Sequence, residues 1–539
     1  MSRIKGTLVG VIKVKVHQTN RCFRMNHTME RLKKMEEREY STLTRVLFGL
    51  ETPTPVSSDP QALEPEIRDM GFVDKTLNGS QKEAIRFVLA SREVALIHGP
   101  PGVCPSQYRN QTTIANTTQT GKTYTLIELI LQLIQRKLRV LVCGPSNISV
   151  DNIVERLAPH KVPMVRIGHP ARLLPSVLNH SLDVLTQTSE AAGILKDIRK
   201  EMDSKQAGIK KTRNGRERRA IYGEMKEVRK EYRIRENQCV TNLVGGSKVV
   251  LATLHGAGGF QLRHEKFDVV IIDEASQALE AQCWVPLLTA KKVVLAGDHL
   301  QLPPTIKSLN SKSRPGKVKS DTNGTKKDVP GASLEVTLFD RLLMLHGPSI
   351  KRMLTIQYRM HEKIMRFPSD ELYESNLVAA DAVKARLLVD LPYEVQATDD
   401  TQEALIFWDL QGGDFPEKTE DEDTEKKTSK GAIMGDSKSN EMEAALVRFH
   451  VGNLIEAGVL AEDIAVVTPY NAQLALMSHD MKEKFPSIEL GSIDGFQGRE
   501  KEAIVVSLVR SNPEHEVGFL AEKRRLNGKP KLATSRIPS

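Results

Sequence analysis

Short apolar runs rich in β-branched residues recur along the chain, and each is followed by a polar or glycine-rich stretch. They fall at 94–97, 139–142, 248–252, 268–272, 292–296, 464–468 and 504–509. Runs that are continuously apolar, rather than alternating, are typical of parallel strands buried on both faces. Because helical patterns separate the runs, the sequence predicts an α/β fold of doubly wound parallel sheets, with sites at the carboxyl ends of the strands.

The segment 189–237 has a helical pattern instead. Residues 196–235 carry 15 basic and 7 acidic side chains. Two apolar stripes with a 3.6-residue period run through it, formed by Ile194, Ile198 and Met202 and then by Ile221, Met225, Val228 and Tyr232. We expect a helical hairpin with one apolar seam, which is either an arm that follows nucleic-acid phosphates or a solvated helix pair without a ligand.

Composition limits the kinds of partner and metal site that this chain is expected to have. Lys and Arg exceed Asp and Glu by 77 to 68, which suggests a polyanionic partner. No apolar run approaches the ~18 residues that span a bilayer, so no membrane partner is expected. The five cysteines form no CxxC pair, which argues against a structural zinc site. The polar segments 306–330 and 411–440 lack a period that buries a face, and we expect both to be flexible loops.

A phosphate-binding loop is present in two separated halves. The run 94–97 leads into Gly99, Pro100, Pro101 and Gly102, and Thr120, Gly121, Lys122 and Thr123 open the next helical pattern. Joined, the halves read GPPGTGKT, a loop in which backbone N–H groups cradle phosphates, the lysine reaches the β- and γ-oxygens and the final hydroxyl binds Mg²⁺. We do not expect so tight a loop to tolerate the insertion of residues 103–119.

We interpret the insert 103–119 as translated intron sequence. Val103-Cys104 can be encoded GTA TGT, which is a splice-donor signal, and Ala115-Asn116 and Gln119 can be encoded as a branch site and an acceptor. A natural surface insertion is the alternative.

An acidic pair, Asp273 and Glu274, follows the run 268–272. In such a pair the first carboxylate suits Mg²⁺, and the second can orient and deprotonate an attacking water molecule. Three further motifs follow predicted strands and are weak singly: GDHLQLPP at 297–304, QYRMH at 357–361 and DGFQGRE at 494–500.

Taken in order, these motifs resemble those of superfamily-1B helicases, over residues 24–527. The nearest branch contains the immunoglobulin-mu-binding helicase and the fungal DNA polymerase α-associated helicases. The resemblance implies two RecA-like lobes of the P-loop NTPase class with an ATP cleft between them. It also implies an ATP- and Mg²⁺-dependent helicase that moves 5′→3′ on single-stranded or forked DNA or RNA.

The resemblance assigns roles to individual residues. Around the nucleotide it implies that Gln81 reads adenine, Tyr358 stacks on it, Gln301 and Arg359 sense the γ-phosphate, and Glu500 touches the ribose and the cleft. Lys122, Asp273, Glu274, Gln301 and Arg359 are thus the expected catalytic residues, with Thr123 and Asp273 at the metal. Around the nucleic acid it implies contacts from Pro145, Ser146, Asn147 and Thr253, and from the hairpin residues Arg216, Arg218 and Arg219.

The expected domains follow from the same resemblance. They are a shortened β-barrel and helical lead-in at 1–75, lobe 1 at 76–345, lobe 2 at 346–527 and an unrelated tail at 528–539. The family continues past Arg524-Arg525-Leu526-Asn527 into a segment that supplies an arginine finger, and that segment is not found here. With the split loop, this predicts that the chain as written binds nucleic acid but hydrolyses almost no ATP.

Three functional readings therefore stay open. One is a helicase in the nucleus, the cytoplasm or both, associated with DNA polymerase α or with ribosomes. Another is an ATPase that remodels nucleoprotein complexes without unwinding. The third is a catalytically impaired nucleic-acid-binding product of a mis-spliced gene model.

Overall fold

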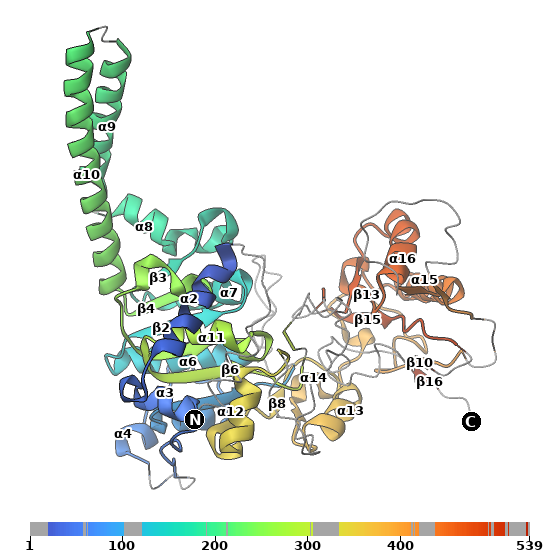
Figure 1. The fold of residues 1–539 in the computed structure, drawn as a ribbon. Helices are drawn as coiled ribbons and strands as arrows, with labels where there is room; N and C mark the ends of the chain where they lie inside the picture. Colours follow the sequence, from blue (N-terminus) through green and yellow to red (C-terminus); the bar gives the residue numbers. More distant parts are fainter. Residues whose placement is uncertain are drawn as a thin grey trace, which may run out of the picture. The chain divides into compact units, whose positions relative to one another are not determined.

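The computed structural model describes residues 20–57, 61, 63–101, 121–189, 191–211, 214–301, 303–304, 334–410, 413, 415–419, 437–493, 495–496, 501–512, 516 and 535–536. Figure 1 traces the chain. The insert 103–119, the loop 306–330, residues 1–19 and most of the C-terminal tail lie outside the described residues. None of the helices in the described ranges combines the length and the apolar character needed to cross a membrane.

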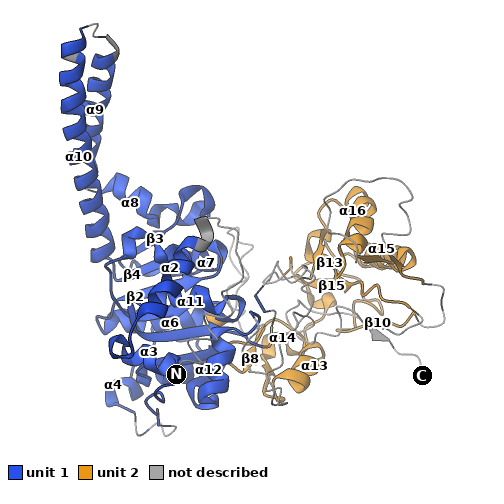
Figure 2. Ribbon diagram, in the orientation of Figure 1, with its two compact units in different colours: residues 1–98, 123–299, 303–353 blue, residues 99–122, 300–302, 354–539 orange. Residues whose placement is uncertain are grey.

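The chain divides into two compact units, which Figure 2 colours separately. Unit 1 comprises residues 1–98, 123–299 and 303–353, and unit 2 comprises residues 99–122, 300–302 and 354–539. The last change of unit falls after Met353, whereas the expected lobe boundary is at 345. The reason is that residues 351–353 pair with the first strand of unit 1.

Unit 1 is built on a seven-stranded parallel sheet in the order β3-β4-β2-β5-β6-β1-β7. Its strands are β1 Val94–His98, β2 Val140–Gly144, β3 Met164–Ile167, β4 Val249–Thr253, β5 Phe267–Ile272, β6 Ala290–Gly297 and β7 Lys351–Met353. Because every pair is parallel, all carboxyl ends lie along one edge, which we call the carboxyl edge.

Helices cover both faces of this sheet. Every residue of β1 and of β2 is buried, and successive side chains of a strand point to opposite faces, so neither face is open to solvent. The connecting helices include α5 Gly79–Ala90, α6 Gly121–Gln135, α7 Asn147–Leu157, α8 Leu182–Thr188, α11 Glu280–Leu287 and α12 Leu338–His346. The predicted doubly wound α/β class is confirmed.

All five apolar runs predicted before residue 300 are strands of this sheet. Two strands were not predicted. In β3, Arg166 interrupts the apolar run, and β7 is a short edge strand whose residues are only half-buried. Both lack the continuous apolar character of a central strand.

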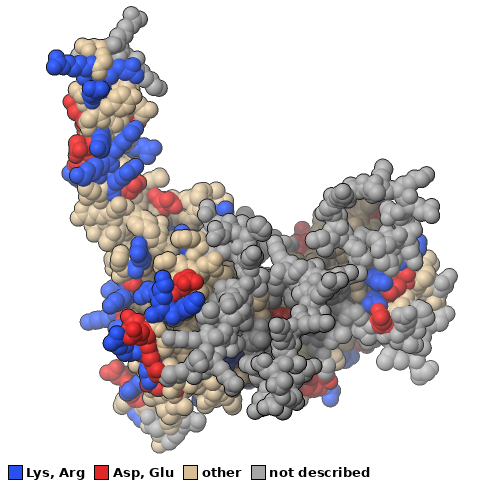
Figure 3. Space-filling view, in the orientation of Figure 1, with Lys and Arg blue, Asp and Glu red and all other residues tan. Residues whose placement is uncertain are grey.

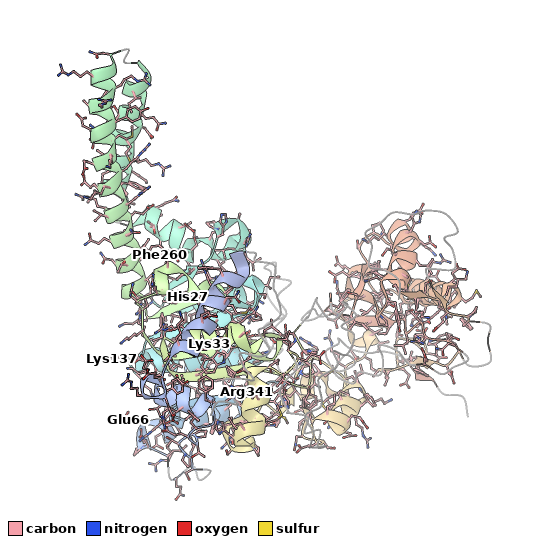
Figure 4. The ribbon with its side chains drawn as sticks, viewed as in Figure 1. His27, Lys33, Glu66, Lys137, Phe260 and Arg341 are labelled. Carbon is pink, nitrogen blue, oxygen red and sulfur yellow. The ribbon has the colours of Figure 1, made fainter. Side chains whose placement is uncertain are left out.

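The N-terminal helices α2 Asn20–Lys34, α3 Thr42–Leu47 and α4 Pro65–Arg68 belong to unit 1, and α2 and α3 contribute to its core. Phe48, which follows α3, stacks on the fully buried Trp284 with ring centroids 4.9 Å apart. Arg341 of α12, labelled in Figure 4, pairs with both carboxylate oxygens of Glu280 and donates to the carbonyl of Leu47 at 2.9 Å. These contacts hold the helical lead-in on the sheet.

The predicted helical hairpin is confirmed. Helices α9 Ala191–Lys211 and α10 Gly215–Gly246 pack along one another and stand out from the rest of unit 1 (Figure 1). The hairpin extends beyond the predicted end at 237 because the last turns of α10 pack on the core, where Val244 is fully buried.

One member of the first predicted stripe is wrong. Ile194 is 51% exposed, whereas Ile198 and Met202 are half-buried, and Ala192, Leu195 and Ile209 complete the buried seam of α9. In α10 the prediction holds, since Met225 is buried and Ile221, Val228 and Tyr232 are half-buried.

Unit 2 contains a three-stranded parallel sheet in the order β14-β13-β15, with β13 Ile464–Thr468 in the centre, β14 Glu489–Ser492 and β15 Ala503–Val506. Helices α15 Glu441–Glu456 and α16 Asn471–Lys484 pack beside it around a core that includes Val451 and Val466. The smaller elements are the helices α13 Glu362–Leu372 and α14 Asp381–Lys384 and three two-stranded ladders. The ladders pair β8 Ile356–Gln357 with β9 Val378–Ala379, β10 Phe407–Trp408 with β16 Ser535–Arg536, and β11 Lys418–Thr419 with β12 Lys438–Ser439.

The segment 411–440 is not wholly a loop. Its ends form the antiparallel ladder of β11 Lys418–Thr419 and β12 Lys438–Ser439. Asn440 is buried, and its side chain accepts from the backbone N–H of Glu443 and so caps α15. The acidic centre lies outside the described residues.

Candidate nucleotide and nucleic-acid sites

The carboxyl edge of the unit 1 sheet divides into two halves. The phosphate turn, the acidic pair and the GDHLQLPP motif follow β1, β5 and β6, which are neighbours in the order β5-β6-β1. Pro145, Ser146 and Asn147 follow β2, and Thr253 ends β4, which is also a neighbour of β2. We call these the nucleotide half and the nucleic-acid half. Each motif was predicted from a different stretch of sequence, and the sheet order alone groups them.

The two halves of the split phosphate loop meet in the structure. A Cβ atom added to Gly99 would lie 3.0–3.2 Å from side-chain carbons of Lys122, so the lysine side chain passes directly over the turn that follows β1. Lys122 and Thr123 are 4% and 8% exposed in the first turn of α6. The expectation that the insert separates Gly99 from Lys122 is therefore wrong, because the two residues are in contact. Gly102 and Thr120 lie outside the described residues.

The acidic pair lies on a strained turn. Glu274 has φ +52°, a left-handed conformation that costs a non-glycine residue about 1–3 kcal/mol. A carboxylate oxygen of Asp273 accepts the N–H of Glu274 at 2.9 Å, and Gln277 donates to the carboxylate of Glu274 at 2.9 Å. Asp273 is 5% exposed. Both carboxylates are thus held at fixed positions at the end of β5.

Gln81 lies at the N-terminus of α5. Its Oε1 accepts the backbone N–H of Asn78 at 2.9 Å, while Oδ1 of Asn78 accepts the backbone N–H of Gln81 at 3.0 Å. This capping box ties down the carbonyl end of the Gln81 amide. In the same helix, the guanidinium of Arg86 lies over the ring of Phe72 at 5.2 Å.

The nucleic-acid half is more open. Ser146 is exposed and caps α7 by accepting the N–H of Ser149 at 3.1 Å, and Pro145, Asn147 and Thr253 are half-buried. Oγ1 of Thr253 accepts the N–H of Gly256 at 3.0 Å, which shapes the turn after β4. These residues present hydroxyl and amide groups beside a helix N-terminus, a place that suits phosphate oxygens.

The side chain of Asn147 accepts a hydrogen bond from a buried arginine, Arg166, that the sequence analysis did not single out. Arg166 of β3 donates to Oδ1 of Asn147 at 3.1 Å and to a carboxylate oxygen of Asp151 at 2.7 Å. Arg166 is fully buried and Asp151 is 1% exposed. The sequence does contain a sign of this role, because Arg166 is a charged residue within an otherwise apolar strand.

Two exposed apolar side chains follow β2 and β4 along the chain. Ile148, in the first turn of α7, is 64% exposed, and Phe260, in the short helix Phe260–Leu262 after β4, is 67% exposed. Phe260 lies near the base of the hairpin (Figure 4).

The hairpin residues Arg216, Arg218 and Arg219 lie in the first turns of α10, near the tip, and all three are exposed. Figure 3 shows Lys and Arg side chains crowded on this part of the hairpin. An arm with this charge can approach the backbone of a nucleic acid.

Tyr358 and Arg359 lie on unit 2 in a turn that a buried glutamine builds. Oε1 of Gln357 accepts the N–H groups of Arg359 and Met360 at 2.9 and 2.7 Å, and Nε2 donates to the carbonyl of Met360 at 2.6 Å. Gln357 was quoted in the motif but given no role. Gln301 is half-buried, and Glu500 lies outside the described residues.

A parallel α/β unit with a lysine-bearing turn and a carboxylate pair at its carboxyl edge defines a nucleotide-binding protein of the P-loop class. Family models described as AAA domains match residues 76–309 and 334–529. The chain is 48% identical over 504 residues to the DNA polymerase alpha-associated DNA helicase A of Schizosaccharomyces pombe, covering 94% of this chain and 68% of that protein. It is 43% identical over 508 residues to the DNA-binding protein SMUBP-2 of Rattus norvegicus, covering 94% of this chain and 46% of that protein.

The chain belongs to the superfamily-1 helicases, in the Upf1-like branch that includes helicase A and SMUBP-2. By family it is an ATP-hydrolysing helicase. It spans about two thirds of the fungal relative and less than half of the rat protein. Among solved structures, an arterivirus nonstructural protein 10 helicase matches with a TM-score of 0.35 at 10% identity over 84% of this chain and 61% of that chain, a likeness from which nothing further follows.

Proposed function

We propose that this chain is an ATP-dependent helicase that moves 5′→3′ along single-stranded DNA or RNA. The observation that carries the proposal is the divided carboxyl edge, where a phosphate turn and an acidic pair lie beside an open surface of hydroxyl and amide groups. Because both halves belong to one sheet, a rearrangement in the nucleotide half can reach the nucleic-acid half through a single packed element.

On the nucleotide half, Lys122 binds the β- and γ-phosphates of ATP. The Thr123 hydroxyl and the Asp273 carboxylate would hold Mg²⁺, since hard oxygen donors of this kind suit that ion. When bound, Mg²⁺ neutralises charge on the phosphate oxygens. Glu274, which its strained turn and Gln277 hold in place, orients the attacking water and accepts its proton.

The remaining nucleotide contacts are carried over from the family. Gln81, whose Oε1 accepts the N–H of Asn78 and is so held at the start of α5, reads adenine. Gln301 and Arg359 sense the γ-phosphate, Tyr358 stacks on adenine and Glu500 contacts the ribose.

On the nucleic-acid half, Pro145, Ser146, Asn147 and Thr253 contact the backbone of a single strand. Phe260 offers an exposed ring on which a base can stack. The hairpin arginines add contacts to phosphates. Contacts to backbone and to base faces carry little sequence information, so we expect low sequence specificity.

The test is strand displacement with matched tailed duplexes. Unwinding of 5′-tailed but not 3′-tailed duplexes, with ATP turnover stimulated by single strands, supports the proposal. Stimulated turnover without displacement favours the remodelling ATPase. DNA and RNA tails in parallel identify the substrate.

The same assays decide whether the insert matters. The full chain and the chain without residues 103–119 should be compared for ATP affinity and turnover. Nucleic-acid binding without turnover in both would overturn the enzyme proposal and leave the binding protein. Association with DNA polymerase α, which the fungal relative's name states for that protein, and a nuclear or cytoplasmic location are carried over as part of this proposal.

A further inference from the structure

A buried hydrogen bond joins the ends of β1 and β6. His98 is the last residue of β1, and Asp298 directly follows β6, where Gly297 is paired with His98 in register. Nε2 of His98 lies 2.8 Å from Oδ1 of Asp298, and each side chain is 2% exposed. Because the carboxylate accepts, His98 Nε2–H donates.

Asp298 also reaches the segment that follows β5. Its backbone N–H donates to Oγ of Ser276 at 3.1 Å, and Ser276 is 3% exposed. The approach is close because residue 297 is glycine. A Cβ there would lie 3.0 Å from both the backbone nitrogen and Oγ of Ser276.

These contacts connect three functional segments of the proposed helicase. The phosphate turn starts at Gly99, one residue after His98. The acidic pair ends at Glu274, two residues before Ser276, and Gln301 comes three residues after Asp298. One aspartate thus touches the segments that hold the phosphate turn, the catalytic carboxylates and the γ-phosphate sensor.

We propose that Asp298 is a positioning residue, which fixes these three segments relative to one another and so sets the rate of ATP turnover rather than the affinity for ATP. The inference rests on the proposed ATPase function. It adds a residue that acts through His98 and Ser276 and does not itself touch the nucleotide. Weakening a buried hydrogen bond between the strand ends costs more than weakening an exposed one, so the segments are expected to shift.

A metal site is the competing interpretation of the same side chains. His98, Asp298 and His299 each offer a ligand atom, and all three atoms lie within 4.8 Å of one another. Two ligands at ~2.0–2.1 Å from a tetrahedral ion are roughly 3.3 Å apart, however, whereas the His98 and Asp298 atoms are at hydrogen-bond distance. The ring of His299 instead stacks on Phe339 with centroids 5.5 Å apart.

The experiment compares Asp298→Asn, His98→Gln, His98→Leu and Ser276→Ala in the full chain and in the chain without residues 103–119. Asp298→Asn and His98→Leu should lower kcat by about tenfold or more while KM for ATP changes less than about threefold. His98→Gln keeps a side-chain donor and should recover part of the loss. The double variant His98→Leu/Asp298→Asn should be no worse than His98→Leu alone, since Asp298→Asn weakens the same hydrogen bond that His98→Leu removes.

Asp268→Asn is the matched control. Asp268 also joins two strands of this sheet, accepting the N–H of Arg139 at 3.0 Å, but it lies at the amino end of β5. It should leave kcat and KM unchanged. An Asp298→Asn protein with wild-type kcat, or with an altered KM only, would overturn the inference, as would Zn²⁺ inhibition that His299→Ala relieves.

Hydrogen exchange without nucleotide separates failure of the inference from failure of the proposed function. Asp298→Asn should speed amide exchange at residues 273–277 and 297–301, but not at 264–268. If the wild-type protein hydrolyses no ATP in either form, the proposed function fails while this result still supports the positioning role. Unchanged exchange at 273–277 in an active protein overturns the positioning role alone.

Discussion

The two halves of the carboxyl edge differ in how far their side chains are exposed to solvent. On the nucleotide half, Lys122, Thr123 and Asp273 are each less than 9% exposed, whereas on the nucleic-acid half Ser146 is exposed and Asn147 and Thr253 are half-buried. A small phosphate ligand can be enclosed, and electrostatic interactions gain strength where water is excluded. A polymer that must slide needs a surface that stays open. The same sheet edge provides both environments.

The halves also differ in how their side chains are supported. Asp298 links strand ends across the nucleotide half, while Arg166 supports the nucleic-acid half from beneath α7. Both supporting residues are buried, and each contacts residues of one half. Variants of one support should therefore affect one ligand and spare the other.

The largest expected effect is that of Glu274→Gln on the nucleotide half. Loss of a general base costs typically about 10²–10⁴-fold in kcat. ATP affinity and single-strand affinity should stay near wild type, because glutamine keeps the shape and the contact with Gln277. Turnover and ATP-analogue titration should be measured with and without residues 103–119. Turnover near wild type would remove Glu274 from this role.

Arg166→Met tests the support of the nucleic-acid half. It leaves the Asp151 carboxylate buried without its cation, which should destabilise the protein by about 3–5 kcal/mol. The double variant Arg166→Met/Asp151→Leu should recover much of this stability. Single-strand affinity should not recover, because Asn147 still lacks the donor that orients it. ATP affinity should be measured as the control and should not change. If single-strand affinity recovered together with stability in the double variant, Arg166 would not have the supporting role.

Charge reversal at the hairpin tip should change the salt dependence of binding. With Arg216, Arg218 and Arg219 changed to Glu, the log–log slope should fall by roughly 0.7 per lost contact, or about 2 in all. The matched control reverses Lys137, Lys161 and Lys266, which are exposed and precede β2, β3 and β5 at the opposite edge of the sheet. Equal slopes in the two triple variants would mean that the hairpin is a solvated helix pair.

The smallest expected effect is a change in stability on substitution of Asp268, which lies at the amino end of β5. Burial raises the pKa of its carboxyl, but hydrogen bonds from the Arg139 N–H and from Lys291, with their charges, hold the pKa below its usual value. The folded state therefore binds the proton less tightly than the unfolded state. The contribution is present above the ordinary Asp pKa of ~3.9 and is lost as pH falls through the lower folded value.

Asp268→Asn should accordingly cost under about 1 kcal/mol at neutral pH, in keeping with a partly exposed ion pair. Urea midpoints measured between neutral and acid pH should converge with those of the wild type as the carboxyl is protonated. A constant difference across that range would show that the Asp268 charge is not the cause.

Much of unit 1 could be predicted because buried parallel strands need continuous apolar runs, and the site motifs directly follow those runs. The prediction was weaker where polar residues enter strands. The strand β3 was not predicted because Arg166 interrupts its apolar run, and β7 was not predicted because it is short and half-buried. In the hairpin, spacing alone placed Ile194 on the apolar seam of α9, but Ile194 is exposed, and Ala192 and Leu195 are buried at that end of the helix.

By itself, the sequence determined the fold class, the family and the segments that carry the chemistry, because these depend on local runs and short motifs. Only the tertiary structure decided which segments meet. It brought Gly99 beside Lys122 despite the insert, and joined His98 to Asp298 across 200 positions of the chain. It also placed Arg166 under Asn147. Such contacts depend on strand order and on complementary buried groups, and neither is written in the spacing of residues along a chain.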